Sequence, residues 1–222
     1  MRLFLDTANI DEIREINEWG VLKGVTTNPT LLAREHGDIE KAWLQILELV
    51  DGDVSLETTE PEADAMYEQG KHLASLGENA IVKVPMTPAG ITAGRRLTDE
   101  GIRINVTLTF SPAQAILAAE IPAYIVSPFL GRIDDVGADG MHALRQICEI
   151  YDVQGYETQV LAASLRHPMH VIDAALAGAD IATMPYDVFK KLVKHPLTDK
   201  GLESFDKDWK QLQEELKTKK GA

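Results

Sequence analysis

The chain has 222 residues, of which 45% are hydrophobic and 6% aromatic, and its 35 acidic and 22 basic side chains give a net charge of −13. This length and composition are typical of a globular protein with one sizeable core. No apolar run approaches the ~20 residues of a membrane span, and residues 1–6 lack the pattern of a signal peptide, so we expect a cytoplasmic protein that does not bind membranes. The negative charge also disfavours nucleic acid as a partner.

Eight short β-rich runs alternate with helical patterns along the whole chain. The runs are Leu3–Thr7, Gly24–Asn28, Val54–Thr58, Ala80–Pro85, Ile102–Thr109, Ala123–Phe129, Thr158–Ser164 and Ile181–Pro185. This alternation predicts an α/β fold with a parallel sheet, and eight such units predict a closed (β/α)8 TIM barrel. A doubly wound open sheet is the alternative.

Helix-start signals punctuate the segments between the runs. Asn9 is followed three residues later by Glu12, Thr87 precedes a proline, and Ser111 opens a capping box that ends at Gln114. Each pattern predicts a helix that begins at the next residue.

The last helical pattern differs because no strand follows it. Leu202, Phe205, Trp209, Leu212 and Leu216 share one face of an additional C-terminal helix, which we expect over residues 201–219. No linker separates this segment from the barrel, so we expect residues 1–222 to form a single domain. The apolar face of the helix must pack either on its own barrel or on a neighbouring subunit.

One lysine lies among four apolar or β-favouring residues in Ile81-Val82-Lys83-Val84-Pro85, a stretch that reads as a buried parallel strand. Burying an ammonium group is costly, so a lysine in a buried parallel strand needs a reason. Desolvation favours the neutral, nucleophilic amine, which suits Schiff-base chemistry on a carbonyl. The alternative is a lysine whose ammonium group reaches solvent at the end of the strand.

Polar residues gather near the C-terminal ends of the runs, where barrel enzymes place their active sites. They are Asp6, Asn28, Glu57, Lys83, Thr107, Ser127 and Ser164, with Arg132 and Arg166 just beyond the sixth and seventh runs. Asn28 and Ser164 could serve as turn formers only. The full set nevertheless predicts an active site at this end of the barrel.

Five motifs in these positions resemble those of a known family. They are Leu5-Asp6-Thr7-Ala8-Asn9, Gly24-Val25-Thr26-Thr27-Asn28-Pro29, Val82-Lys83-Val84-Pro85, Asn105-Val106-Thr107-Leu108-Thr109-Phe110-Ser111 and Ser127-Pro128-Phe129-Leu130-Gly131-Arg132. Together they resemble the signatures of transaldolases, in the small subfamily that also contains fructose-6-phosphate aldolases. The resemblance extends over essentially the whole chain.

The resemblance implies a catalytic group of four residues. Lys83 would attack the ketose carbonyl and form an imine, which stabilises the carbanion left when the C3–C4 bond breaks. Asp6 would exchange a proton with the C4 hydroxyl, and Glu57 and Thr107 would hold the water that shuttles protons. We expect Val82, Val84 and Phe129 to surround the amine, with Asp6 and Glu57 reached over one hydrogen bond or a water.

The resemblance also implies a set of substrate-binding residues. Asn28 and Asn105 would hydrogen-bond sugar hydroxyls, and Ser127 and Phe129 would line the substrate site. Thr26 and Thr27 would shape the strand end without touching the sugar.

Arg132, Arg166 and Ser164 resemble the phosphate clamp of the family. A guanidinium group binds phosphate oxygens bidentately, and an acidic protein needs such a local positive charge to bind a sugar phosphate. The alternative is that each arginine pairs with a nearby acid, for instance Arg132 with Asp134 or Asp135.

Two residues favour transfer over net aldol cleavage. Glu57 and Phe129 match transaldolases, whereas the aldolases of the subfamily typically have glutamine and tyrosine there. A phenylalanine cannot protonate the enamine, so we expect transfer of a dihydroxyacetone unit from sedoheptulose 7-phosphate to glyceraldehyde 3-phosphate. The alternatives are a fructose-6-phosphate aldolase and a non-catalytic sugar-phosphate-binding barrel. Thr58 and Leu165 depart from the family pattern and leave the preferred acceptor open.

We predict neither a cofactor nor a metal. The sequence has no nucleotide-binding glycine loop, dinucleotide fingerprint or zinc motif, and His167 and His170 are interpreted as structural. Members of the subfamily often form rings of five that pair into decamers, with the last helix against a neighbour. The resemblance therefore implies a homo-oligomer, pentameric or decameric.

Overall fold

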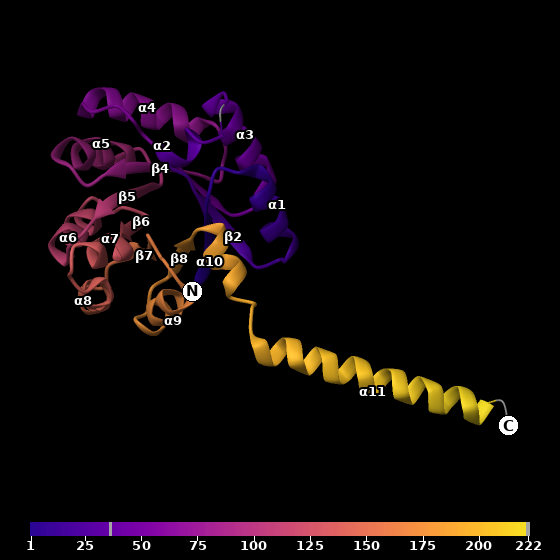
Figure 1. The fold of residues 1–222 in the computed structure, drawn as a ribbon. Helices are drawn as coiled ribbons and strands as arrows, with labels where there is room; N and C mark the ends of the chain where they lie inside the picture. Colours follow the sequence, from indigo (N-terminus) through magenta and orange to yellow (C-terminus); the bar gives the residue numbers. More distant parts are fainter. Residues whose placement is uncertain (36, 221–222) are drawn as a thin grey trace. The chain divides into compact units, whose positions relative to one another are not determined.

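Eight parallel strands form a closed barrel in the computed structural model, which describes residues 1–35 and 37–220 (Figure 1). Each strand pairs with the next along the chain, and β8 pairs with β1. The strands are β1 Arg2–Asp6, β2 Leu22–Thr26, β3 Asp53–Glu57, β4 Ala80–Pro85, β5 Ile104–Thr109, β6 Ile125–Pro128, β7 Gln159–Ala162 and β8 Ile181–Met184. The predicted (β/α)8 barrel is therefore confirmed, and the open sheet is excluded.

Helices follow the strands along the chain, and those between β1 and β8 surround the sheet (Figure 1). The helices are α1 Ile10–Glu18, α2 Pro29–Leu32, α3 Ile39–Leu49, α4 Ala63–Ser75, α5 Pro88–Asp99, α6 Pro112–Glu120, α7 Leu130–Asp135, α8 Gly140–Gln154, α9 Pro168–Leu176, α10 Tyr186–Lys191 and α11 Pro196–Lys220. Asn9, Thr87 and Ser111 cap α1, α5 and α6 as predicted, each side chain accepting from a backbone N–H of the first turn. A capping box would have Gln114 accept from the N–H of the N-cap residue Ser111. Its Oε1 instead accepts from the N–H of the preceding residue, Phe110, at 2.7 Å.

Several strands end before the residues that the sequence placed in them. Asn28 lies outside β2 because its side chain caps α2, with Oδ1 accepting from the Leu31 N–H at 3.0 Å. Phe129 follows β6 and pairs with Ala163 in an isolated bridge. Ser164 lies two residues beyond β7 and has a φ of 60°, a left-handed backbone conformation. The corrected ends place all three residues in the loops above the barrel.

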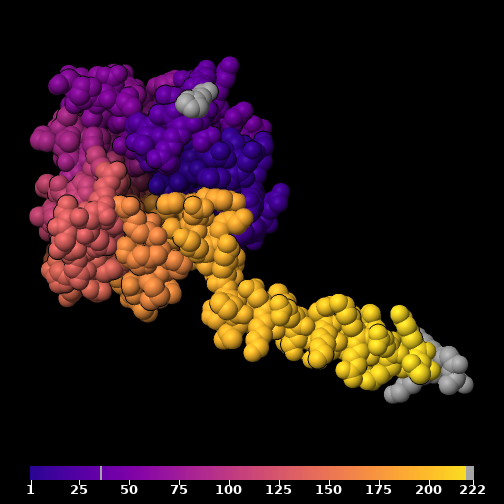
Figure 2. Space-filling model, in the orientation of Figure 1, coloured from indigo at the N-terminus to yellow at the C-terminus, as the bar shows by residue number. Residues whose placement is uncertain are grey.

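The interior of the barrel is filled by side chains. Phe4, Ile125, Leu161 and Ile181 are fully buried in one cluster. Gly24 of β2 makes room for this cluster, because a Cβ there would lie 2.5 Å from the Phe4 ring. The space that looks open between the ribbons in Figure 1 is accordingly occupied by side chains in Figure 2.

A charged network closes the N-terminal end of the barrel. The Asp53 carboxylate, which begins β3, accepts from Arg2 and Arg103 at 2.7 Å each and from the Tyr124 hydroxyl at 3.2 Å. Arg2 also donates to Gln159 at the start of β7. Because Asp53 is 8% exposed, its charge needs compensation. The two arginines, which reach solvent, supply it.

The chain divides into two compact units. The first, Met1–Phe189, contains the whole barrel, and the second begins at Lys190 and contains α11. The helix begins at Pro196, five residues before the predicted start at residue 201, and proline is favoured in a first helical turn. Within residues 1–35 and 37–220, no helix combines the length and apolar character needed to cross a bilayer.

We predict that Asp53→Asn lowers the free energy of unfolding by about 2 to 3 kcal/mol, because two arginines lose their carboxylate partner. Urea denaturation measures this change. Asp64→Asn is the matched control, since that carboxylate is 95% exposed and pairs with one arginine at 2.6 Å. Its loss should cost less than about 1 kcal/mol. Equal effects of the two substitutions would contradict the role of the network.

Candidate active site

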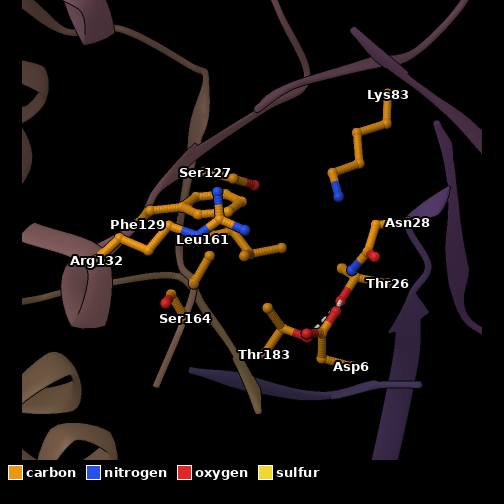
Figure 3. Close-up of a pocket in the computed structure, with 11 residues that line it drawn as sticks. Asp6, Thr26, Asn28, Lys83, Ser127, Phe129, Arg132, Leu161, Ser164 and Thr183 are labelled. Atoms are coloured by element: carbon orange, nitrogen blue, oxygen red, sulfur yellow. Dashed lines mark hydrogen bonds between the residues drawn. The ribbon is translucent and has the colours of Figure 1, made fainter. Parts of the chain in front are cut away.

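A cavity opens at the C-terminal ends of the strands (Figure 3). It is lined by Asp6, Thr26, Asn28, Lys83, Ser127, Phe129, Arg132, Leu161, Ala163, Ser164 and Thr183. Seven of these eleven residues belong to the site predicted from the sequence. The strand ends therefore converge on one cavity, as expected for a barrel enzyme.

Lys83 directs its amine into this cavity (Figure 3). The residue is 4% exposed, and Nζ lies 2.9 Å from Glu57 Oε2 and donates to the Thr27 carbonyl at 3.2 Å. In the register of the barrel, Lys83 lies between Glu57 on β3 and Asn105 on β5. The pairing of adjacent parallel strands thus brings the amine and a carboxylate together.

The surroundings of Lys83 differ from the sequence-based expectation. Val82 and Val84 were expected around the amine, but side chains alternate along a strand, so both point the other way. A Cβ added at Gly70 of α4 would lie 3.2 Å from Val82, and one at Gly94 of α5 would lie 3.5 Å from Val84. The two valines therefore pack against the helices, and the amine contacts polar groups.

Asp6 is held by a pair of threonines. The Thr26 hydroxyl donates to Asp6 Oδ1 at 2.7 Å and lies 2.7 Å from the Thr183 hydroxyl (Figure 3). Burial raises the pKa of Asp6 above its usual range, against the opposing effects of the Lys83 charge and the Thr26 hydrogen bond. A carboxylate with a raised pKa is a better proton acceptor than one in water.

Sequence reasoning undervalued Thr26 and missed Thr183. Thr26 was expected only to shape the strand end, yet it lines the cavity and binds Asp6. Thr183 was missed because the eighth run was taken to end in the apolar Met184-Pro185. The available signal was its position one residue before that apolar end, on the opposite face of the strand.

A buried chain of side-chain hydrogen bonds lies beside the lysine. Ser127 donates to Asn105 Oδ1 at 2.7 Å, and Asn105 Nδ2 donates to Ser55 Oγ at 3.1 Å. Asn105 is 0% exposed and does not line the cavity, although the sequence predicts that it binds substrate. Ser55 was not identified from the sequence, because it lies mid-strand. The chain fixes the orientation of Ser127, which does line the cavity.

Thr107 is buried on β5, paired in register with Pro85 of β4. Its hydroxyl has no hydrogen-bond partner among the residues that the structure describes. A buried hydroxyl without a partner is costly, so this group is expected to take a polar partner when the site is in use.

The two predicted phosphate-binding arginines lie in different environments. Arg132 lines the cavity with its guanidinium carbon 5.0 Å from the centre of the Phe129 ring, and it pairs with no carboxylate within residues 1–35 and 37–220. Arg166 does not line the cavity, and its guanidinium donates to Asp135 Oδ2 at 2.7 Å. Pairing with an acid, the alternative considered for each arginine, is therefore found for Arg166.

His167 and His170 serve the start of α9. His167 caps the helix, with Nδ1 accepting from the His170 N–H at 3.3 Å. No group of three or more histidine, cysteine, aspartate or glutamate side chains suited to a metal ion is found among the described residues.

Comparisons with known proteins identify relatives over nearly the whole chain. The transaldolase/fructose-6-phosphate aldolase family matches residues 3–216. A probable transaldolase of Aquifex aeolicus is 53% identical over 96% of this chain and 99% of its own length. Probable transaldolase 1 of Bacillus cereus is 55% identical over 96% of this chain and 100% of its own length.

The solved structure of thiamine phosphate pyrophosphorylase from Pyrococcus furiosus superposes with a TM-score of 0.58 over 83% of this chain and 85% of that one. At 16% identity this likeness shows a shared barrel fold only. The family match over residues 3–216 and the relatives above 50% identity show more than a shared fold. On their strength, the chain belongs to the transaldolase/fructose-6-phosphate aldolase family of enzymes.

Proposed function

We propose that this chain is a transaldolase that moves a dihydroxyacetone unit from sedoheptulose 7-phosphate to glyceraldehyde 3-phosphate, giving erythrose 4-phosphate and fructose 6-phosphate. The observation that carries the proposal is the buried Lys83 amine at the cavity, 2.9 Å from Glu57, in a chain of this family. Membership of the family supports sugar phosphates as substrates, and the proposal extends to a role in the pentose phosphate pathway in the cytoplasm.

The first step is attack of the Lys83 amine on the ketose carbonyl. Glu57 contacts the ammonium group and so can take its proton, which releases the lone pair for attack. The carbinolamine then loses water and becomes a protonated imine. Thr107, whose hydroxyl has no partner among the described residues, supplies a polar group for the departing water on the side of β5.

The second step breaks the C3–C4 bond. Asp6 removes the C4 hydroxyl proton, the electrons of the bond move into the imine, and an aldehyde and an enamine result. The burial that raises the Asp6 pKa favours this proton transfer. Thr26 and Thr183 keep the carboxylate in one orientation, so it can return the proton when the enamine adds to a new aldehyde.

Phe129 and Arg132 have separate roles in the cavity. The Phe129 ring lines the cavity without a hydroxyl that could protonate the enamine, so the enamine persists until an aldehyde arrives. Arg132 and Ser164 line the same cavity and supply donors for the phosphate of either sugar. Arg166 would join them on leaving Asp135.

The oligomeric state is a further part of the proposal. The face of α11 formed by Leu202, Phe205, Trp209, Leu212 and Leu216 is 44 to 72% exposed along its length. A continuous apolar stripe of this kind marks a protein interface. We infer that α11 packs on a neighbouring copy, in a homo-oligomer of five or ten subunits.

Borohydride reduction tests the Schiff base directly. Wild type incubated with fructose 6-phosphate should carry a covalent adduct on the peptide that contains Lys83, detected by mass spectrometry. Lys83→Met should remove the adduct and lower kcat/KM at least about a thousandfold, because no other group supplies the electron sink. Lys71→Met, at an exposed lysine outside the cavity, is the matched control.

The same experiment separates the alternatives. A wild type that forms no adduct would favour a non-catalytic sugar-phosphate-binding barrel. An adduct accompanied by release of free dihydroxyacetone in the absence of acceptor would favour the aldolase.

Asp6→Asn should lower kcat by about a hundredfold to ten-thousandfold, because the variant cannot accept the C4 proton.

The Asp6 carboxyl should also make the stability of wild type depend on pH. A raised carboxyl pKa means that Asp6 favours folding below its ordinary value of 3.8 and that this contribution is lost as the pH rises through the folded pKa. The variant should therefore gain stability over wild type as the pH rises.

Urea denaturation of both proteins between pH 4 and 7, with Asp11→Asn as an exposed control, measures the Asp6 effect. A stability difference that stays constant with pH would contradict a raised pKa for Asp6.

Trp209→Glu should reduce the assembly to smaller species, because it places a charge in the apolar stripe of α11. Lys207→Glu introduces the same side chain on another face of the helix and should leave the assembly intact. Light scattering after size exclusion gives the mass of each species. A monomeric wild type would contradict the inference about α11.

A further inference from the structure

The turn after β7 has an unusual backbone. Ser164 has a φ of 60°, a left-handed conformation that side chains other than glycine disfavour. Residues held this way persist only where the surroundings over-determine them. The turn is fixed to α7 by the Leu130 N–H on the Ala163 carbonyl at 3.0 Å and the Gly131 N–H on the Ser164 carbonyl at 3.1 Å.

Gly131 allows the close approach. A Cβ at this position would lie 2.2 Å from the Ser164 carbonyl oxygen and 2.5 Å from Arg166 Nε. The side chain of Arg166 therefore packs on α7 at Gly131, the residue that precedes Arg132 in the chain. The two arginines of the predicted phosphate clamp depend on the same contact between α7 and the turn.

His170 of α9 holds the other side of the turn. Its Nδ1 accepts from the Arg166 backbone N–H at 3.3 Å, and its Nε2 lies 3.3 Å from Asp134 Oδ2 on α7. The residue is 8% exposed, and its ring centre lies 3.9 Å from that of His167. One buried imidazole thus connects the backbone of Arg166 with the helix that carries Arg132.

These contacts define the protonation state of the ring. Because Nδ1 accepts a hydrogen bond, the proton of the neutral imidazole is on Nε2, which faces the carboxylate. Burial lowers the pKa of His170, as do His167 and Arg166, while Asp134 and Asp173 oppose the shift. A protonated ring could not accept the Arg166 N–H.

We propose that His170 is a positioning residue for phosphate recognition: its neutral ring fixes the turn that carries Ser164 and Arg166 against α7, without touching the sugar. The inference rests on the proposed function, since it assumes that the cavity beside Arg132 receives the phosphate. Loss of the contact should weaken recognition of the phosphate and leave the chemistry at Lys83 unchanged.

The test compares fructose 6-phosphate with fructose, which lacks the phosphate. For each sugar, the second-order rate constant of borohydride trapping is measured in wild type and in His170→Ala. We expect the ratio of the two constants to fall about tenfold in the variant, with the constant for fructose nearly unchanged. His170→Asn, whose Oδ1 can replace Nδ1 as the acceptor, should restore the ratio to within about twofold of wild type.

His167→Ala controls for damage to α9, because it removes the helix cap and leaves the Arg166 contact in place. Its ratio should match wild type. An unchanged ratio in His170→Ala, or an equal loss for both sugars, would overturn the inference. A wild type that forms no adduct with either sugar would instead overturn the proposed function, and this inference with it.

A pH series gives a second readout that a merely structural role would not move. Ionisation of the phosphate affects wild type and His170→Asn alike, whereas His170→Asn lacks the imidazole that must stay neutral. Between about pH 8 and 5, the ratio in wild type should therefore fall more steeply than in His170→Asn. Coincident profiles would overturn the requirement for an unprotonated Nδ1.

Discussion

The contact between Lys83 and Glu57 is the interaction on which the rest of the site depends. Two opposite charges are taken out of water together, which costs free energy unless each finds close partners. The amine has two, Glu57 Oε2 at 2.9 Å and the Thr27 carbonyl at 3.2 Å. Glu57 is paired in register with Lys83, and Thr27 directly follows β2, so a shift of β3 against β4 by one residue would take the carboxylate away from the ammonium. The closed barrel prevents such a shift, because every strand is paired on both sides.

The two ends of the barrel differ in how well their polar groups are paired. At the N-terminal end, Asp53 is saturated by two arginines and a tyrosine hydroxyl. At the C-terminal end, Ser164 has a disfavoured backbone conformation, and Thr107 Oγ1 has no partner in the part of the chain that the structure describes. A strained backbone and an unsatisfied hydroxyl thus occur at the end of the barrel where the substrate is proposed to bind, and the rigid scaffold sustains them.

Sequence periodicity predicts the barrel and the cavity end because both depend on local patterns that repeat. It fails where the outcome depends on which face of a strand a residue occupies or on a long-range partner. Val82 and Val84 were assigned to the lysine, although strand alternation turns them toward the helices. Thr183 was missed because it directly precedes the apolar Met184-Pro185 at the end of the eighth run. The pairing of Arg166 with Asp135 joins residues 31 positions apart and leaves no local signal.

The electrostatics of the cavity follow from the net charge of −13. A phosphate approaching this protein is repelled overall, so the cations that line the cavity must supply the attraction. Lys83 is neutralised by Glu57, which leaves Arg132 as the unpaired cation within the described cavity lining. Arg166, outside the cavity lining, is bound to Asp135 in an exposed pair of a kind that contributes little to stability. A dianionic phosphate can therefore compete with Asp135 for Arg166, whereas a sugar without phosphate cannot. If the proposed phosphate binding holds, the ion pair would keep the second arginine available for phosphorylated substrates.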